Sequence, residues 1–322
     1  MLTAYPNPEH EPADRSTPAT LASALWIDLV HPTEEELRAV EAVLGVELPS
    51  RQEAEEIEAS SRLYVEADTL FMIAAVMVNA DTPQPGLTPI TFAFQRERVV
   101  TVRFAEPKSI ALFERRLRRS PAAFPSAQKL LLGLFDEIID RIADILEVVG
   151  ADLNRISAVV FTEPQKMPGR ASPDFTSILS HVGLNGLRAA NARESLVSLS
   201  RIPPFFAVSL KGSGGELLDD SWQTVGTDIS SLSDHATFVS GKVSFFLDAT
   251  LGRISNEQNT IIKLFSVLAV VFLPPTLIAS IYGMNFDYMP ELRWALGYPL
   301  SLLLMVGAAV LPYLLFKRKG WL

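Results

Sequence analysis

Two long runs of apolar residues dominate the C-terminal end of the chain. After Lys263 the next charged residue is Asp287, and the roughly 23 uncharged residues between them are enough for a helix to cross a bilayer. A second run of about 23 uncharged residues extends from Trp294 to Phe316. We therefore predict membrane-spanning helices at residues 261–286 and 296–316, joined by a loop at residues 287–295.

Ahead of the first run, apolar residues recur at alternating spacings of three and four, the pattern of a helix that packs along a seam. This seam extends from Ile229 to Phe246, and no proline occurs between Pro204 and Pro274. We expect one stalk helix, residues 216–260, that continues directly into the first span. A helix of this length needs packing partners, which identical chains around an axis would supply.

The N-terminal part carries short apolar runs rich in strand-forming residues and separated by turn residues. These runs lie at residues 24–30, 63–65, 70–78, 88–95 and 98–104. Thr33 and Glu36 have the capping-box spacing of a helix start, and Ser50–Ser60 has the composition of a second acidic helix. We expect an α/β domain at residues 24–125, preceded by a proline-rich disordered tail at residues 1–23.

Helical periodicity follows this domain. Apolar residues form one stripe at residues 126–161, and a second helical pattern occurs at residues 175–200. Together they predict an antiparallel helical hairpin within residues 126–215. Pro203 and Pro204 are expected to interrupt the second helix ahead of a flexible, glycine-rich connector.

Charge divides the chain into two parts of opposite sign. The whole chain has a net charge of −9, with 37 acidic and 28 basic residues. From Arg253 onward, six basic and three acidic residues give +3, which leaves −12 on residues 1–252. Such a surface repels nucleic acid and attracts cations, although ordinary solubilising charge explains the same numbers. We expect divalent cations and membrane lipid as partners, and no nucleic acid.

The chain offers little for tight metal binding or catalysis. It contains no cysteine, and its four histidines lack the spacing of a helical zinc site. Oxygen ligands would have to bind any metal, which favours hard cations such as Mg²⁺. No GxSxG, HExxH or phosphate-binding loop motif occurs, so we expect neither an enzyme nor a covalently bound cofactor.

Basic residues flank the outer ends of the two spans. Lys263 lies at the start of the first span, and Lys317, Arg318 and Lys319 follow the second. The connecting loop carries two acidic residues and one basic residue. The positive-inside rule places the N-terminal domain and both termini in the cytoplasm and the loop outside. We expect a multi-pass protein of the cell inner membrane.

One face of the first span is polar at both ends and apolar between them. Steps of three or four residues along this face give Asn259, Ile262, Phe265, Ala269, Leu273, Thr276 and Ser280. In a homo-oligomer the face would line a pore whose apolar middle gates by dewetting. Alternatively, it packs against the second span. The periodicity leaves both interpretations open.

The first span ends in Tyr282-Gly283-Met284-Asn285-Phe286, followed by Met289-Pro290-Glu291-Leu292, and the second span leads into Lys317-Arg318-Lys319-Gly320-Trp321-Leu322. In these segments the chain resembles the CorA family of magnesium transporters, and fainter similarity covers residues 26–30 and 56–60. The resemblance implies a funnel-shaped homopentamer with cytoplasmic α/β domains, long stalk helices and a pore lined by the first span of each subunit.

The resemblance also implies roles for single residues. Gly283, Met284 and Asn285 would form the outer selectivity site, and Asn259 would lie at the inner mouth of the pore. Ile262 and Leu273 match positions of a hydrophobic constriction, whereas Phe265 and Ser280 depart from the residues of some relatives. A basic collar at the cytoplasmic mouth would consist of Lys263, Lys317, Arg318 and Lys319.

The function implied by the resemblance is uptake of Mg²⁺, and also of Co²⁺ and Ni²⁺, down the electrochemical gradient. A ring of Asn285 side chains would select the hydrated ion, and cytoplasmic Mg²⁺ would close the pore by bridging acidic residues of neighbouring subunits. The stalk offers Asp228, Asp234 and Asp248 for this regulatory site, although each also fits an ordinary solvated aspartate. Two alternatives stay open: a zinc transporter of the same superfamily, and a non-conducting membrane-anchored sensor or scaffold.

Overall fold

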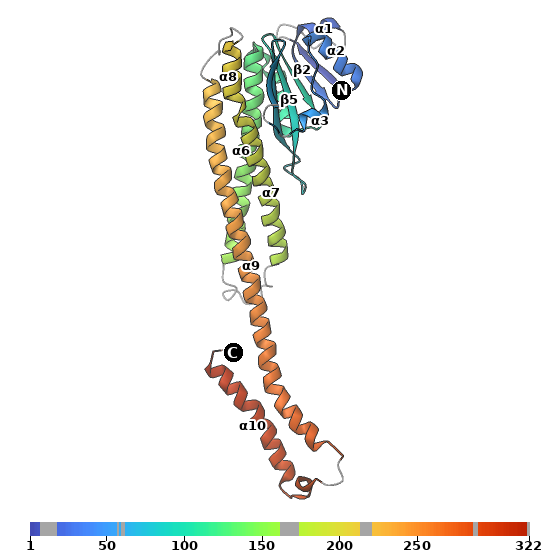
Figure 1. The fold of residues 1–322 in the computed structure, drawn as a ribbon. Helices are drawn as coiled ribbons and strands as arrows, with labels where there is room; N and C mark the ends of the chain where they lie inside the picture. Colours follow the sequence, from blue (N-terminus) through green and yellow to red (C-terminus); the bar gives the residue numbers. More distant parts are fainter. Residues whose placement is uncertain are drawn as a thin grey trace. The chain divides into compact units, whose positions relative to one another are not determined.

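The computed structural model describes residues 1–6, 18–56, 58, 62–161, 174–212, 221–285 and 289–320. The chain divides into two compact units, Met1–Leu247 and Asp248–Leu322. Unit 1 contains a mixed sheet and the helices that cover it, whereas unit 2 contains two apolar helical segments (Figure 1). Helix α9 (Ser221–Tyr282) begins in unit 1 and ends in unit 2.

The sheet of unit 1 has six strands in the order β1-β2-β6-β5-β4-β3. Its strands are β1 (Leu2–Pro6), β2 (Ala24–Val30), β3 (Leu63–Glu66), β4 (Thr69–Val78), β5 (Gly86–Gln95) and β6 (Arg98–Arg103). β2 and β6 are parallel, and every other neighbouring pair is antiparallel. The expected α/β character of this domain is confirmed, and β2 to β6 lie where the apolar runs predict strands.

The helices of unit 1 are α1 (Pro18–Ser23), α2 (Glu34–Leu44), α3 (Arg51–Ala54), α5 (Lys108–Arg119), α6 (Ala127–Phe161), α7 (Phe175–Ser200), α8 (Ile202–Gly212) and the first part of α9. They cover both faces of the sheet because successive strand residues point to opposite sides. Ile27 and Leu29 pack with residues of α1 and α2, whereas Trp26 and Phe92 pack with residues of α5 and α6.

The expected disordered tail at residues 1–23 is wrong at both of its ends. β1 pairs antiparallel with β2, and α1 immediately precedes that strand. Tyr5 of β1 stacks on Trp26 of β2 with ring centroids 4.5 Å apart, which buries both side chains. A strand of five residues among prolines is too short for its alternation to be recognised. Residues 7–17 lie outside the described part of the chain.

The predicted capping box at Thr33 is present and a second, unpredicted one occurs at Ser50, but the second acidic helix is much shorter than expected. Thr33 caps α2 and Ser50 caps α3, each through reciprocal hydrogen bonds with the glutamate three residues later. The expected helix over Ser50–Ser60 is wrong beyond α3, which ends at Ala54. Ala54 is the single buried residue of α3, and the sequence provides no apolar stripe that would hold a longer helix against the core. Residues 57 and 59–61 lie outside the described part.

Helix α8 was not predicted. Pro203 and Pro204 interrupt the helical pattern after α7, as expected, but they also stand in the first turn of α8. Proline is tolerated there because the first backbone N–H groups of a helix have no intrahelical acceptor. Phe206 and Leu210 then bury one face of α8 against the core. The expected flexible connector at residues 211–215 is wrong at Lys211 and Gly212, which end α8, and its other residues lie outside the described part.

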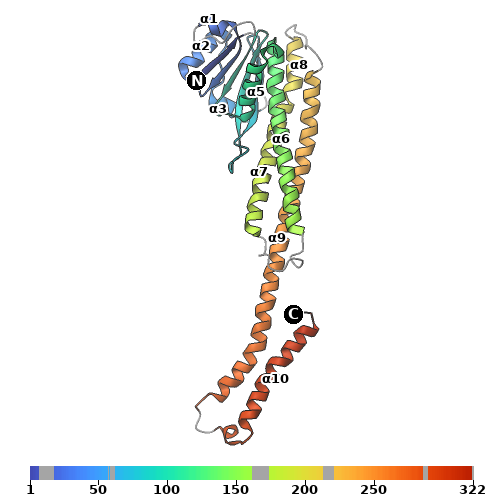
Figure 2. The ribbon, with the colours of Figure 1, turned by 180° about the vertical axis from the view of Figure 1, so that it is seen from behind.

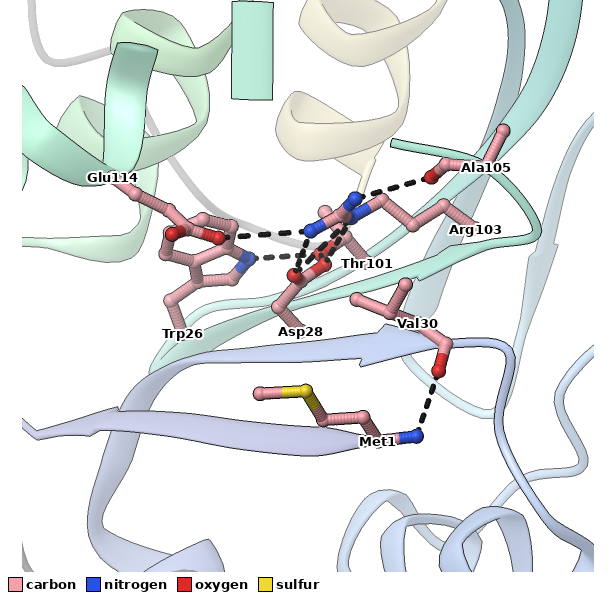
Figure 3. A network of polar contacts seen from close by, with 8 residues as sticks. All are labelled: Met1, Trp26, Asp28, Val30, Thr101, Arg103, Ala105 and Glu114. Atoms are coloured by element: carbon pink, nitrogen blue, oxygen red, sulfur yellow. Dashed lines mark hydrogen bonds and ion pairs between the residues drawn. The ribbon is translucent and has the colours of Figure 1, made fainter. Parts of the chain in front are cut away.

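A polar cluster is buried between the sheet and α5 (Figure 3). The Arg103 guanidinium donates to both carboxylate oxygens of Asp28, with distances from 2.8 to 3.2 Å. The Thr101 hydroxyl donates to Asp28 at 2.6 Å and accepts from Nε1 of Trp26 at 2.9 Å. Glu114 of α5 lies 3.6 Å from the same guanidinium, and its burial raises the pKa of its carboxyl group. The cluster fixes the parallel strands β2 and β6 to each other.

The first part of α9 packs on the other helices of unit 1. Trp222 lies against Phe206 of α8 and Phe135 of α6, with ring centroids 4.3 and 5.7 Å apart. The predicted seam is buried at Ile229, Ala236, Val239 and Phe246. Part of this seam is therefore covered within one chain, whereas the neighbouring Phe238 and Phe245 stay 63% and 56% exposed.

Unit 2 consists of the second part of α9, the short helix η3 (Pro290–Arg293) and α10 (Gly297–Arg318). Helices α9 and α10 are long and apolar enough to cross a membrane, as predicted. α10 folds back beside the end of α9 (Figure 1, Figure 2). Pro274 and Pro275 lie inside α9 without ending it. α10 extends two residues beyond the predicted span, into the basic cluster.

Candidate functional site

The two apolar helices of unit 2 pack against each other along one seam. On α9 the buried or partly buried residues are Val267, Val271, Pro274, Pro275, Ile278 and Tyr282. On α10 they are Gly297, Ser301, Met305, Ala308, Ala309, Pro312 and Phe316. Both sets recur every three or four residues, the spacing of one helix face. Each helix therefore uses one face for contact within the chain.

The predicted pore face lies on the opposite side of α9. Counting at 3.6 residues per turn places Ile262, Leu273 and Ser280 roughly half a turn from the middle of the seam. Every predicted member of this face is exposed, and Ile262, Phe265 and Leu273 are exposed by 60%, 66% and 66%. The other members of the face are also exposed: Asn259, Ala269, Thr276 and Ser280. The interpretation that this face packs against the second span is therefore wrong for the single chain.

A tight turn after Tyr282 ends α9 and presents the Gly283-Met284-Asn285 triplet. The backbone N–H of Gly283 donates to the carbonyl of Ala279 at 2.9 Å, and that of Met284 donates to the carbonyl of Ile281 at 3.3 Å. A Cβ atom at position 283 would lie 3.1 Å from the Ala279 carbonyl oxygen, so glycine leaves room for this turn. Asn285 follows in irregular backbone and is exposed. Residues 286–288 lie outside the described part.

The residues of the predicted basic collar are all exposed. Lys263 lies on α9, Lys317 and Arg318 lie in the last turn of α10, and Lys319 caps that helix. Because α10 folds back beside α9, its C-terminal turn lies toward the Lys263 end of the hairpin (Figure 1, Figure 2). The four positive charges are thus at the end of the hairpin remote from Asn285.

The three aspartates expected for a regulatory metal site do not come together within one chain. Asp228, Asp234 and Asp248 are exposed at separate places along α9. Among the described residues, no group of three or more His, Asp or Glu side chains has the arrangement of a metal site. A single chain therefore provides no complete regulatory site in its described part.

Asp228 instead lines a pocket of about 390 Å³ together with Asp136, Asp140 and Arg116. Partial burial, followed by the charge of Asp140, raises the pKa of Asp136, and burial also raises the pKa of Asp140. Sequence reasoning missed the two α6 aspartates. Their i, i+4 spacing places them on one helix face, but only the packing of α9 brings Asp228 beside them.

Comparisons with known proteins identify the fold and the family. A family model described as CorA-like Mg²⁺ transporter protein matches residues 22–318. Magnesium transport protein CorA of Salmonella typhimurium is 36% identical over 303 residues, which covers 94% of this chain and 93% of that protein. The protein of the same name from Escherichia coli strain K12 is 37% identical over 302 residues, with the same coverage.

Solved structures share the fold. The complete structure of the CorA magnesium transporter from Methanocaldococcus jannaschii is 17% identical, with a TM-score of 0.72, and the match covers 100% of this chain and 99% of that chain. The full-length CmaX protein gives a TM-score of 0.61 at 16% identity, covering 92% and 88% of the two chains. Because both the family model and the relatives span nearly the whole sequence, the chain belongs to the CorA family of magnesium transporters.

Proposed function

We propose that five copies of the chain form a funnel-shaped channel in the cell inner membrane and conduct Mg²⁺ into the cytoplasm, with Co²⁺ and Ni²⁺ as further permeant ions. Both termini lie in the cytoplasm in this proposal, because basic residues flank the outer ends of the two spans. The names of the curated relatives support magnesium as the transported ion.

The observation that carries the proposal is the position of the exposed face of α9. This face points away from α10, is polar at Asn259, Thr276 and Ser280, and ends next to the Asn285 turn. Polar side chains facing hydrocarbon are costly, so they face the protein interior or water in membrane proteins. Copies of α9 around a common axis would turn this face toward a central pore, with α10 on the outside.

Asn285 provides the chemistry that hydrated Mg²⁺ requires. Mg²⁺ loses its water slowly, so a ring of neutral amide oxygens can accept hydrogen bonds from the bound water without removing it. A ring of carboxylates would bind the ion more tightly and slow its release. The tight turn at Gly283 supports this role because it leaves Asn285 exposed at the end of the helix.

The membrane potential supplies the driving force. A divalent ion that crosses 100 mV gains roughly 4.6 kcal/mol, twice the value for a single charge. Ion entry then needs no ATP, which agrees with the absence of a phosphate-binding loop motif from the sequence. Ile262 and Leu273 would form the apolar constriction, with Phe265 between them, and the basic collar would surround the cytoplasmic mouth.

Feedback by cytoplasmic Mg²⁺ is a further part of the proposal. Because the described part of one chain holds no complete acidic metal site, the ion would bridge residues of different subunits. Asp228, Asp234 and Asp248 are exposed and so available for such bridges. Mg²⁺ enters this proposal both as the transported ion and as the regulatory ligand.

The proposal is tested by replacing the amide of Asn285. We expect Asn285→Ala to abolish magnesium uptake and growth at low Mg²⁺ in a strain that requires imported magnesium. Asn256→Ala is the matched control, since it removes the same amide from a position of α9 outside the predicted pore face. Normal growth of the Asn285→Ala strain at low Mg²⁺, at equal expression, would contradict the role of the triplet.

A further inference from the structure

A polar pocket lies between α6 and α7, which run side by side in unit 1 (Figure 1, Figure 2). Its volume is about 340 Å³. This volume is at the small end of the range for ligand-binding pockets, so the pocket suits a small ligand. The residues that line it are Asp152, Arg155, Ile156, His181, Leu184, Asn185 and Arg188.

Asn185 brings a buried amide with unused donors to this pocket. Its side chain is 2% exposed, and Oδ1 accepts a hydrogen bond from Nη1 of Arg188 at 3.4 Å. Within the described part of the chain, Nδ2 of Asn185 donates to no acceptor. A buried donor without an acceptor is unfavourable. Because Asn185 lines the pocket, an acceptor bound there would complete its hydrogen bonding.

Arg188 brings a positive charge that no carboxylate of the described residues pairs with. Its Nε donates to the backbone carbonyl of Ala80 at 2.9 Å, and Nη1 donates to Asn185. Both acceptors are neutral, and the side chain is partly buried. The bond to Ala80 fixes the plane of the guanidinium. A guanidinium held in this way is well suited to donate two hydrogen bonds to one oxyanion.

The other ionisable groups of the lining leave the pocket with a net positive charge. Arg155 donates to Asp152 at 2.8 Å, so these two charges compensate each other. His181 is exposed and adds an imidazole at the edge. The uncompensated charge of Arg188 contrasts with the −12 that residues 1–252 carry in total. The pocket therefore favours an anion, whereas the surface of unit 1 as a whole favours cations.

We propose that this pocket binds a small oxyanion of the phosphate type, supplied either as inorganic phosphate or as the phosphate group of an organic monoester. Arg188 and the Nδ2 of Asn185 donate to its oxygens, and Arg155 and His181 lie at the rim. Because Arg188 also holds the Ala80 carbonyl, the bound anion would tie α7 to the chain segment that follows β4. This inference concerns unit 1 and does not rest on the proposed function.

Equilibrium dialysis of the full-length protein in detergent, at fixed free Mg²⁺, tests the site with radiolabelled inorganic phosphate and adenosine monophosphate. We expect saturable binding of one anion per chain, and a rise of the unfolding temperature with anion concentration, because the ligand binds the folded state. Tighter binding of inorganic phosphate would identify the free ion as the ligand, and tighter binding of the monophosphate would identify the ester.

Arg188→Gln should weaken binding by at least about tenfold, because hydrogen bonds to a charged group are lost. Arg193→Gln is the matched control, since Arg193 is an exposed arginine of α7 outside the pocket lining. It should leave the affinity unchanged. An equal loss in both variants would show that general positive charge, and not this pocket, holds the anion.

Asn185→Asp separates loss of the site from loss of the fold. Its carboxylate has the size of the amide and would pair with Arg188 in place of the anion. We therefore expect this variant to lose phosphate binding while its unfolding temperature without ligand stays at or above that of wild type. The proposal is refuted if wild type binds neither anion saturably, or if Arg188→Gln or Asn185→Asp keeps wild-type affinity.

Discussion

The side chains of Asp28 and Arg103 show how one buried pair holds distant parts of unit 1 together. Asp28 is 1% exposed and Arg103 is 6% exposed, and they are 75 positions apart in the sequence. In the sequence, Asp28 interrupts the apolar run of β2 without visible reason. Its partner is evident only from the parallel pairing of β2 with β6, which places Arg103 and Thr101 beside it.

Replacement of Asp28 by asparagine should destabilise unit 1 strongly. The variant removes the hydrogen-bonded counter-charge of the buried Arg103 guanidinium and leaves it beside Glu114 at 3.6 Å, and loss of one partner of a buried pair costs about 3–5 kcal/mol. Urea unfolding of the full-length protein in detergent measures the change. Glu34→Gln is the control, because its ion pair with Arg38 is exposed and should change the free energy of unfolding by less than about 1 kcal/mol. Equal effects of the two substitutions would contradict this account.

Asp81 should give unit 1 a small acid-sensitive contribution to stability. Hydrogen bonds from Lys108 and Arg141 hold the pKa of Asp81 below its ordinary value of 3.8. Because this pKa is lowered by folding, ionised Asp81 stabilises the folded protein above pH 3.8. This stabilisation is lost as the pH falls through the pKa that Asp81 has in the folded protein. Asp81→Asn should therefore be less stable than wild type by up to about 1 kcal/mol at pH 7.

The pH dependence is the decisive part of this prediction for Asp81. Urea unfolding at pH 7 and at successively lower pH should show the difference between wild type and Asp81→Asn shrinking below pH 3.8. A difference that stays constant or grows with acidification would mean that the ion pairs with Lys108 and Arg141 do not contribute in this way.

At the scale of helices and strands, close packing of α6 depends on one glycine. A Cβ atom at Gly133 would lie 2.4 Å from a ring carbon of Phe124 and 2.9 Å from one of Phe113. Both aromatic rings are buried in the core that α5 and α6 share, and they contact each other edge to face at 5.1 Å. The helix can therefore approach α5 only with hydrogen at this position.

Gly133→Ala should lower the stability of unit 1 by about 1–3 kcal/mol, the usual cost of adding volume to a packed core. Gly150→Ala on the same helix is the matched control, since its added methyl group meets no atom within 4 Å. That control should be neutral or stabilising by up to about 1 kcal/mol, because alanine favours the helix. Thermal unfolding of both variants provides the comparison, and a stabilising Gly133→Ala would contradict the packing argument.

Elements with a helical period or a continuous apolar run were predictable from the sequence, and those with neither pattern were not. The strands β2 and β4, the hairpin of α6 and α7, and the two apolar helices all carry patterns that local side-chain spacing determines. β1 and α8 were missed because their burial depends on Trp26 and Trp222, which lie far from them in the sequence or beyond a break. The pore face was predictable as a pattern, but only the seam with α10 excludes its packing within the chain.

At the scale of the whole molecule, the exposed face of α9 is the feature that a single chain leaves incomplete. Its polar residues Thr276 and Ser280 lie within the predicted span and would face lipid in a monomer, which is unfavourable. We therefore expect native mass spectrometry of the detergent-solubilised protein to show five chains per particle at neutral pH. A predominantly monomeric or dimeric particle would contradict a central pore lined by α9.

The central claim is that the purified protein conducts divalent cations by itself. Ion flux into proteoliposomes, measured separately for Mg²⁺, Co²⁺, Ni²⁺ and Zn²⁺, tests it most directly. We predict Mg²⁺ entry driven by an inside-negative potential, entry of Co²⁺ and Ni²⁺ as well, and loss of flux in Asn285→Ala. Flux of Zn²⁺ without Mg²⁺ would indicate a zinc transporter instead, and absence of any flux from folded, oligomeric protein would indicate a sensor or scaffold.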